Sequence, residues 1–148
     1  MKNKEFEVCI RAIIHHRNKI LVCQDKKEGF YFFPGGHLKF GENIQDALSR
    51  ELKEELNVKI KKVSFIGVVD NIFMHINRKH HEINLVFDVG VNKISERSKE
   101  DHIDFILFSK SKFSKEKILP IALQKAILKW MKNKRIFWAS QMYNKIRI

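Results

Sequence analysis

Residues 44–56 constrain the fold most, because in this segment apolar residues recur at helical spacing between recognisable helix ends. At about 100° per residue, one face of such a helix is apolar. This face carries Ile44, Ala47, Leu48 and Leu52. Asn43 is suited to cap the helix, and Asn57 tolerates the left-handed backbone that ends many helices. The sequence therefore predicts an amphipathic helix from Ile44 to about Leu56.

Segments rich in β-branched residues lie on both sides of this helix. Before it, residues 5–14 and 19–24 flank a short polar segment and predict a β-hairpin. After it, residues 58–73 and 83–91 predict two further strands. The His-rich, basic segment 75–82 between them predicts a loop.

The C-terminal part of the chain predicts a charged loop at 92–104, a short strand at 105–108 and a second amphipathic helix. Pro120 suits the first turn of this helix, and a basic, aromatic tail follows it. Because strands dominate and the two helices are far apart in sequence, we expect an α/β fold in which a mixed sheet is packed between helices.

The composition limits the class of protein. A chain of 148 residues fits one compact domain over residues 1–148. Cys9 and Cys23 each lie in an apolar, strand-like run, which indicates buried thiols rather than a disulfide scaffold. Charged residues interrupt the apolar stretches, so we predict no membrane segment or secretion signal and expect a soluble, cytoplasmic protein.

The formal net charge of +12, from 29 Lys and Arg against 17 Asp and Glu, favours anionic partners. Phosphates, nucleic acid and acidic lipid all meet that description. The alternative is a surface of solvated lysines without any such partner, since Lys is mostly exposed in every protein. Charge alone therefore does not predict a nucleic-acid-binding protein.

Three glutamates of the predicted helix conflict with its apolar face. Glu51 and Glu55 fall inside the apolar arc, and Glu54 lies at its border. Desolvating an unpaired carboxylate costs several kcal/mol, so we expect these charges to be neutralised. A Mg²⁺ ion would do this, because it prefers hard oxygen ligands. The alternative is ordinary ion pairing with neighbouring Arg and Lys residues.

The segment that begins before the helix resembles the Nudix box. That pattern is Gly, five residues, Glu, seven residues, Arg, Glu, an aliphatic, any residue, Glu, Glu, any residue, Gly and an aliphatic. The matching positions are Gly36, Glu42, Arg50, Glu51, Leu52, Glu54, Glu55 and Val58. Asn57 departs from it, standing where the family has Gly, and it is a mild substitution at positive φ. The resemblance covers residues 36–58 and implies the Nudix α/β/α sandwich.

The resemblance implies Mg²⁺-dependent hydrolysis of a nucleoside diphosphate linked to another group, with Mn²⁺ as a substitute ion. It implies metal ligation by Glu51, Glu54 and Glu55, support from Glu42, and a further ligand in the Gly36 carbonyl. Arg50 would orient the carboxylates by bidentate pairing. Metal ions would neutralise the diphosphate and polarise phosphorus, so catalysis would depend mostly on positioning and charge.

The general base stays open on sequence alone. Glu54 of the box is one candidate, and Glu82 beside two histidines is another. The remaining candidates precede the last strand: Glu100, Asp101 and Asp104. Each of the candidates outside the box could equally be a solvated loop charge, and spatial convergence is needed to choose among them.

The sequence constrains substrate recognition less than it constrains metal binding. His37 follows Gly36 and could contact phosphate, and Phe33 precedes the box and could stack a base. Core packing and a neutral surface position are the alternatives. No tyrosine or proline stands about 15 to 18 residues after the box, which weakens the ADP-ribose and dinucleoside polyphosphate interpretations within the family.

Three functions remain as hypotheses. The first is a hydrolase of a small nucleotide, such as a nucleoside triphosphate or nucleotide sugar. The second is an RNA 5′-pyrophosphohydrolase or decapping-type enzyme, which the positive charge favours. The third is a non-catalytic nucleotide sensor, which the retention of all four box glutamates disfavours. Apolar positions in the C-terminal tail would cover the sheet or the partner of a homodimer.

Overall fold

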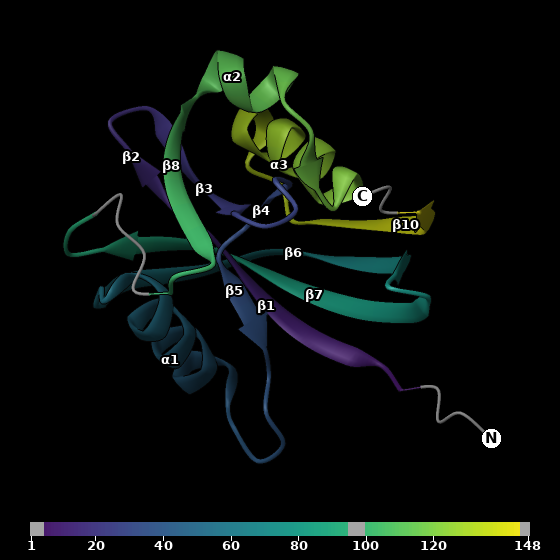
Figure 1. Ribbon diagram of the computed structural model, residues 1–148. Coiled ribbons are helices and arrows are strands. Elements are labelled where there is room, and N and C mark those ends of the chain that lie inside the picture. The colour runs from purple at the N-terminus through teal and green to yellow at the C-terminus, as the bar shows by residue number, and fades with distance from the viewer. Residues whose placement is uncertain (1–4, 95–99, 146–148) are drawn as a thin grey trace.

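The computed structural model describes the backbone of residues 5–94 and 100–145, with side chains through Met142. Within these residues the chain forms two sheets and three helices (Figure 1). The helices lie on opposite sides of the strands, with α1 on one side and α2 and α3 on the other (Figure 1). None of these helices is long and apolar enough to span a bilayer. The predicted α/β/α sandwich is confirmed.

The first sheet has five strands and is mixed. Its order is β10 (Phe137–Lys145), β6 (Ile60–His75), β7 (Arg78–Val91), β1 (Glu7–Ile13) and β5 (Gly35–His37). The pairs β10–β6 and β1–β7 are parallel, and the pairs β6–β7 and β1–β5 are antiparallel. This order places strands from both ends of the chain beside the central hairpin.

The second sheet is smaller and antiparallel except at one edge. Its strands are β2 (His15–His16), β3 (Lys19–Asp25), β4 (Tyr31–Phe32), β9 (Ile118–Leu119) and β8 (Ile103–Ser109). The strand β3 pairs with β8 along its whole length, and β4 pairs with β9 in parallel. The predicted strand at 105–108 is confirmed and begins two residues earlier.

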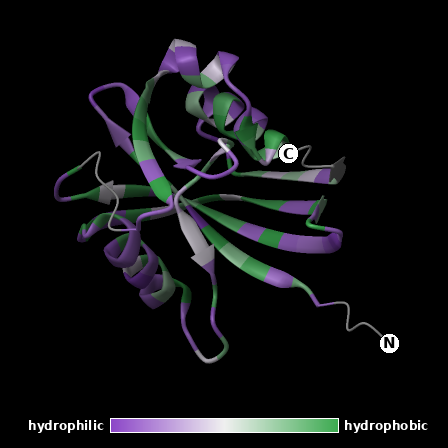
Figure 2. Ribbon diagram, viewed as in Figure 1, coloured by the Kyte–Doolittle hydropathy of each residue, from purple (hydrophilic) through white to green (hydrophobic). Residues whose placement is uncertain are grey.

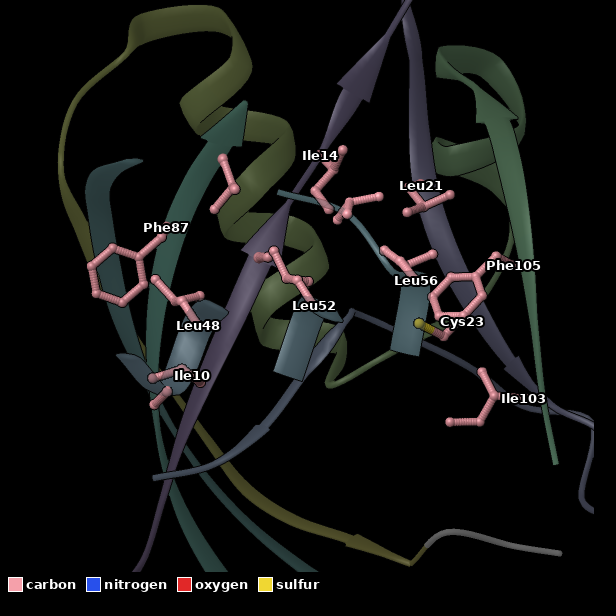
Figure 3. Close-up of a cluster of buried hydrophobic side chains, with 14 residues drawn as sticks. Ile10, Ile14, Leu21, Cys23, Leu48, Leu52, Leu56, Phe87, Ile103 and Phe105 are labelled. Carbon is pink, nitrogen blue, oxygen red and sulfur yellow. The ribbon is translucent and has the colours of Figure 1, made fainter. Parts of the chain in front are cut away.

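Helix α1 (Ile44–Leu56) has the ends that the sequence predicts. The Asn43 side chain accepts a hydrogen bond from the backbone N–H of Asp46 at 2.9 Å, and Asn57 takes the left-handed conformation with φ 54°. Its buried apolar residues pack against strands of both sheets (Figure 3). These residues are Ala47, Leu48, Leu52 and Leu56. Figure 2 shows the contrast between the largely hydrophilic α1 and the hydrophobic stretches of the strands it covers.

Helices α2 (Lys110–Lys115) and α3 (Ile121–Asn133) cover the opposite side and enclose a second apolar cluster. The deepest contributions come from Phe113 of α2 and from Leu123 and Ile127 of α3, all fully buried. The predicted second amphipathic helix is therefore confirmed, although Pro120 lies just before its first turn. The sequence did not predict α2, because six residues give too short a pattern.

The predicted hairpin of residues 5–14 and 19–24 is wrong for most of its length. The strand β1 pairs in the first sheet, and only the two residues of β2 pair with β3. Arg17 and Asn18 form the turn with φ of 46° and 62°. The chain changes sheet after Ile13, so the sequence signal for a hairpin was correct only next to its turn.

The predicted loop at 75–82 is also wrong. The strands β6 and β7 continue through it and meet at a two-residue turn, where Ile76 and Asn77 have φ of 47° and 58°. Its histidines stay in the strands because they find partners there. His80 stacks on Phe73 at 4.9 Å, and His75 lies 3.3 Å from Glu28. A ring stack across the two strands and a contact with a carboxylate outside them therefore replace the apolar alternation that was expected of a strand.

The basic, aromatic tail is strand β10 and pairs in parallel with β6. Its residues Phe137 and Ala139 are partly buried against the second apolar cluster, whereas Trp138 is 83% exposed. The tail thus extends the sheet as its edge strand instead of covering a face of it, and contact with a homodimer partner stays a prediction. Of the predicted loop at 92–104, residues 95–99 lie outside the described part of the chain, and 103–104 belong to β8.

Candidate active site

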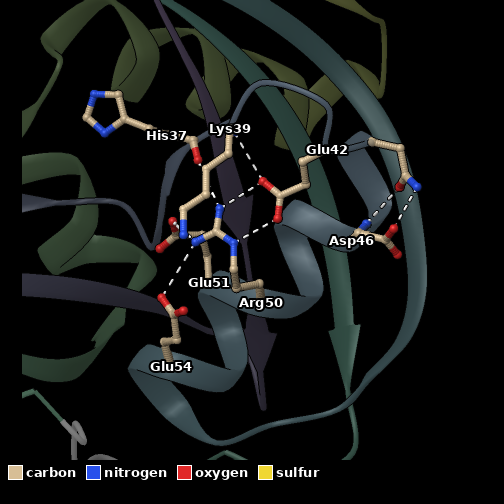
Figure 4. A network of polar contacts seen from close by, with 8 residues as sticks. His37, Lys39, Glu42, Asp46, Arg50, Glu51 and Glu54 are labelled. Carbon is tan, nitrogen blue, oxygen red and sulfur yellow. Dashed lines mark hydrogen bonds and ion pairs between the residues drawn. The ribbon is translucent and has the colours of Figure 1, made fainter.

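Arg50 on α1 joins three of the four box carboxylates, those of Glu42, Glu51 and Glu54, into one network (Figure 4). Its Nε donates to Glu42 Oε1 at 2.7 Å and its Nη2 to Glu42 Oε2 at 3.0 Å. Its Nη1 donates to Glu51 Oε1 at 2.7 Å and lies 3.6 Å from Glu54 Oε2. The Nη2 also donates to the His37 carbonyl at 3.1 Å. One guanidinium therefore fixes the loop before α1 to the glutamates on it.

This network sets the charge of its members. The hydrogen bonds from Arg50 lower the pKa of Glu42 to about 2, and the backbone N–H of Lys39 contributes at 3.1 Å. The same hydrogen bond with Glu42 raises the pKa of Arg50. Glu42 therefore stays ionised throughout the physiological pH range.

Glycine is required where the loop passes α1. A Cβ on Gly36 would lie 2.5 Å from the carboxyl carbon of Glu51, and a Cβ on Gly35 would overlap the Ile10 carbonyl. Gly35 also has a φ of 133°, which disfavours other residues. Gly36 thus lets the backbone approach the carboxylate of Glu51 closely, and Gly35 lets it pass the Ile10 carbonyl on β1.

Glu55 is the buried carboxylate of the site, with only 4% of the residue exposed. It accepts a hydrogen bond from the backbone N–H of Gly35 at 3.3 Å. Burial raises the pKa of Glu55 to about 8, against the lowering effect of that hydrogen bond. A cation close to its oxygens would favour the ionised form.

The donor set fits a divalent cation. In the described part of the chain, no three His, Cys, Asp or Glu side chains already converge as metal ligands, and Glu51 is turned toward Arg50. The chemistry nevertheless suits a hard ion: carboxylate oxygens predominate, and the Gly36 backbone lies against one of them. Burial of Glu55 next to Gly35 adds a carboxylate whose ionised form a cation would stabilise.

A pocket of about 360 Å³ opens beside Glu55, and the other three glutamates of the box do not line it. Gly35 and Glu55 form part of its wall, so the box and the pocket share a boundary. Three aromatic residues also line it: Phe30, Phe32 and Phe73. The pocket can therefore hold an aromatic group within reach of the carboxylates.

Arg11 on β1 is a charged residue of this pocket that the sequence analysis did not single out as a site residue. Its Nε donates to Asn84 Oδ1 at 3.0 Å, and its Nη2 lies 3.9 Å from Glu82 Oε1. Asn84 Nδ2 in turn donates to Glu82 Oε2 at 3.4 Å. The signal in the sequence was a lone arginine within a strand that is apolar on both faces.

Asn71 on β6 also lines the pocket and was missed. The residue is 6% exposed, and its Oδ1 has no hydrogen-bond partner among the described residues. An unsatisfied buried acceptor is costly, and native structures contain few of them. The polar pair at Asp70 and Asn71 within an apolar strand was the available signal.

The other sequence candidates lie in different surroundings. Glu82 lines the pocket, whereas Asp104 is exposed and 3.4 Å from Lys26 Nζ. Glu100 lies 3.4 Å from His102, and Asp101 is exposed. Of these candidates, Glu82 lines the pocket, and Glu100, Asp101 and Asp104 do not.

Neither of the two residues predicted to contact the substrate, Phe33 and His37, lines the pocket. Phe33 is fully buried and packs against Phe113 with ring centroids 6.0 Å apart, so its ring belongs to the core. His37 is exposed, with its Nε2 3.8 Å from Glu7. Aromatic contact to a ligand in the pocket would come from the neighbouring phenylalanines that line it.

Comparison with known proteins places this site in a family. Residues 6–131 match the family model described as NUDIX domain. A protein of Methanocaldococcus jannaschii named ADP-ribose pyrophosphatase is 33% identical over 120 residues, which cover 76% of this chain and 70% of that protein. A match to the 8-oxo-dGTP diphosphatase of Buchnera aphidicola is 36% identical over 58 residues, covering 38% of this chain and 47% of the relative.

A further match is to the mRNA-decapping protein OPG122 of Variola virus, 38% identical over 64 residues, with 43% of this chain and 21% of the relative covered. Among solved structures, the MutT protein of Bacillus halodurans superposes with a TM-score of 0.72 at 17% identity, over 95% of this chain and 91% of that one. The family model and the first relative both span most of the chain. The chain therefore belongs to the Nudix hydrolases, enzymes that act on phosphoric anhydrides and generally use divalent metal ions.

Proposed function

We propose that this enzyme hydrolyses the diphosphate linkage of a small nucleoside diphosphate derivative, such as a nucleoside triphosphate or a nucleotide sugar, with Mg²⁺ as its ion. The main support for the proposal is that Glu55, a residue of the Nudix box, also lines the pocket. Glu55 and Gly35 line the same cavity as three phenylalanines, so a base and a diphosphate fit side by side.

In this proposal the box glutamates hold the ion. Glu51, Glu54 and Glu55 are its side-chain ligands, and the Gly36 carbonyl is a further one. When bound, the ion supplies neutralisation of the diphosphate and Lewis-acid activation of phosphorus. Glu42 and Arg50 position the ligands, because Arg50 contacts both Glu42 and Glu51 at 2.7 Å. Mn²⁺ offers the same preference for oxygen ligands and is the expected substitute.

We assign the general base to Glu54. Its side chain is 51% exposed, and its 3.6 Å contact with Arg50 is longer than those of Glu42 and Glu51. One of its oxygens would hold the ion, and the longer contact with Arg50 would leave the other able to accept a proton from an attacking water. Glu82 is the second candidate because it lines the pocket, although Arg11 and Asn84 both contact it. Asp104 ranks below these two because it is exposed and lies 3.4 Å from Lys26, whereas Glu100, whose charge contributes to the raised pKa of Glu55, is a third candidate.

The test is glutamine substitution at the box. Glu54→Gln and Glu55→Gln should each abolish Mg²⁺-dependent product release while circular dichroism shows a retained fold. Glu5→Gln, at an exposed position outside the box, serves as the matched control. The substrate panel is nucleoside triphosphates, ADP-ribose and other nucleotide sugars, dinucleoside polyphosphates and 5′-triphosphate RNA. Unchanged turnover in both box variants would contradict the proposal.

RNA 5′-end hydrolysis is the second candidate function, supported by the net charge of +12 and by the match to a viral decapping protein. An enzyme of this kind should prefer 5′-triphosphate oligonucleotides over the matching mononucleotide. Its KM for RNA should also rise steeply with salt. Equal kcat/KM on RNA and on free nucleotide decides for the small-molecule function.

A further inference from the structure

A second groove of about 560 Å³ lies between α3 and β10, the helix and edge strand at the upper right of Figure 1. It adjoins the catalytic pocket without belonging to it. Ala122 lines the groove and donates its backbone N–H at 2.7 Å to the side chain of Gln141, which lines the pocket. The contact between these two residues is the boundary between the two depressions.

The groove carries positive charge only. Lys125 and Lys129 line it from α3, and Arg135 lines it from the segment before β10. The surrounding sequence is equally one-sided, because residues 117–142 contain no Asp or Glu. Their basic residues are Lys117, Lys125, Lys129, Lys132, Lys134 and Arg135. This segment therefore contributes +6 of the net charge of +12, and three of its six basic residues line the groove.

Aromatic and apolar side chains alternate with these charges. Trp138 lines the groove with 83% of its surface exposed, and Ile136 is 70% exposed. Trp130 forms part of the same wall, and Lys134 Nζ lies 3.9 Å from the centre of its ring. An exposed aromatic ring beside a row of cations suits a single-stranded nucleic acid, because the ring can stack on a base while the cations neutralise phosphates.

We propose that this groove binds single-stranded nucleic acid, with phosphates along Lys125, Lys129 and Arg135 and a base stacked on Trp138. A second copy of the chain is a poor occupant, because its own groove carries the same charge. A membrane is flat and fits a concave site between a helix and a strand less well. The inference goes beyond the proposed function, since binding here requires neither the metal ion nor cleavage.

The experiment measures binding apart from catalysis. A fluorescent single-stranded RNA of about twelve nucleotides with a 5′-hydroxyl is titrated with protein in EDTA, and anisotropy is read at several salt concentrations. The variant Lys125→Glu/Lys129→Glu should weaken binding at least tenfold. It should also lower the slope of log K against log salt by about 1.4, or about 0.7 per lost phosphate contact.

Two further variants separate stacking from general charge. Trp138→Ala should weaken binding about tenfold with an unchanged salt slope, because it removes a stacking surface and no charge. Lys61→Glu/Lys62→Glu makes the same change of charge at exposed positions on β6 that do not line the groove. This control should keep most of the affinity. All these variants should hydrolyse a mononucleotide substrate at the wild-type rate.

Several results would overturn the inference. One is an equal loss of affinity in the control and the groove variants, which would show a diffuse charge effect. Another is full binding by Trp138→Ala. A third is failure to bind the RNA while sedimenting with phosphatidylserine vesicles, which would identify a membrane surface instead. Loss of hydrolysis in Glu54→Gln with RNA binding retained would leave both proposals standing, and absence of any hydrolysis by the wild type would count against the proposed function alone.

Discussion

Arg50 contacts two carboxylates with different nitrogens, and this is a task that only a planar guanidinium performs well. Its Nε and Nη2 hold Glu42, while Nη1 holds Glu51. The loop that carries Glu42 is thereby fixed to α1 at the point where Gly36 passes Glu51. At the scale of single residues, the site depends on one side chain that positions others.

Substitution of Arg50 by lysine should disturb this positioning while keeping the charge. We expect Arg50→Lys to lower kcat about ten- to a hundredfold, as is usual for residues that orient metal ligands. The pKa of Glu42 should rise from about 2, because a lysine cannot make the bidentate contact. Steady-state kinetics across a Mg²⁺ titration measures the effect, and Arg78→Lys at an exposed position is the control. Wild-type kinetics in Arg50→Lys would contradict this role.

Asn71 tests whether the pocket binds the substrate through its buried acceptor. Asn71→Leu removes an Oδ1 that has no partner among the described residues, so the free protein should become more stable by about 1 kcal/mol. The same change should lower kcat/KM by about tenfold or more if the substrate donates a hydrogen bond there. Urea denaturation and kinetics measure the two effects. A variant that gains stability at unchanged kcat/KM would place the substrate elsewhere.

At the scale of elements, α1 shows what a local pattern predicts well. Its periodicity, its Asn43 cap and its left-handed end at Asn57 all lie within a few residues of one another. The sheets depend on distant pairing, and β1 joins β7 across more than 70 residues, as the register Cys9 to Asn84 shows. No local signal specifies such a partner, which is why residues 5–14 and 19–24 were assigned to one hairpin.

The β6–β7 turn contains an unfavourable residue that can be replaced. Ile76 is β-branched and has a φ of 47°, in a region that costs a residue of this kind about 1–2 kcal/mol. It is 70% exposed, so little burial is lost on substitution. Ile76→Asn should therefore stabilise the protein by about 1 kcal/mol in urea denaturation. Ile76→Val keeps the branch at Cβ and should show no gain; equal stability of both variants would argue against strain at this turn.

At the scale of the whole molecule, the candidate site combines one local motif with residues from separate strands. The box residues could be predicted because 36–58 are contiguous and their spacing is fixed. Arg11 and Asn71 could not be assigned to the pocket, because it is the order β6–β7–β1 that brings their strands together. A polar residue within an apolar strand indicated a special role, and only the pairing of the strands shows that these residues lie in one pocket.

As a buried carboxylate and a proposed metal ligand, Glu55 should couple the stability of the whole fold to pH and to Mg²⁺. Burial raises its pKa from 4.5 to about 8, so the folded state binds this proton more tightly than the unfolded state. Its contribution to stability is fully present below pH 4.5 and is lost as pH rises through 8. In EDTA, Glu55→Gln should therefore match the wild type near pH 5 and exceed it by about 2–4 kcal/mol near pH 8.5.

Saturating Mg²⁺ should narrow this difference near pH 8.5. The ion binds the ionised carboxylates of the folded wild type and adds RT ln(1 + [L]/Kd) to its stability, about 2.7 kcal/mol at one hundred times Kd. Glu55→Gln lacks one ligand and should gain less. Thermal denaturation at pH 5 and 8.5, with EDTA or with Mg²⁺, measures all four conditions. Loss of a metal ligand should reduce the shift in melting temperature that Mg²⁺ causes. If Mg²⁺ shifts the melting temperatures of wild type and Glu55→Gln equally, Glu55 is not a metal ligand.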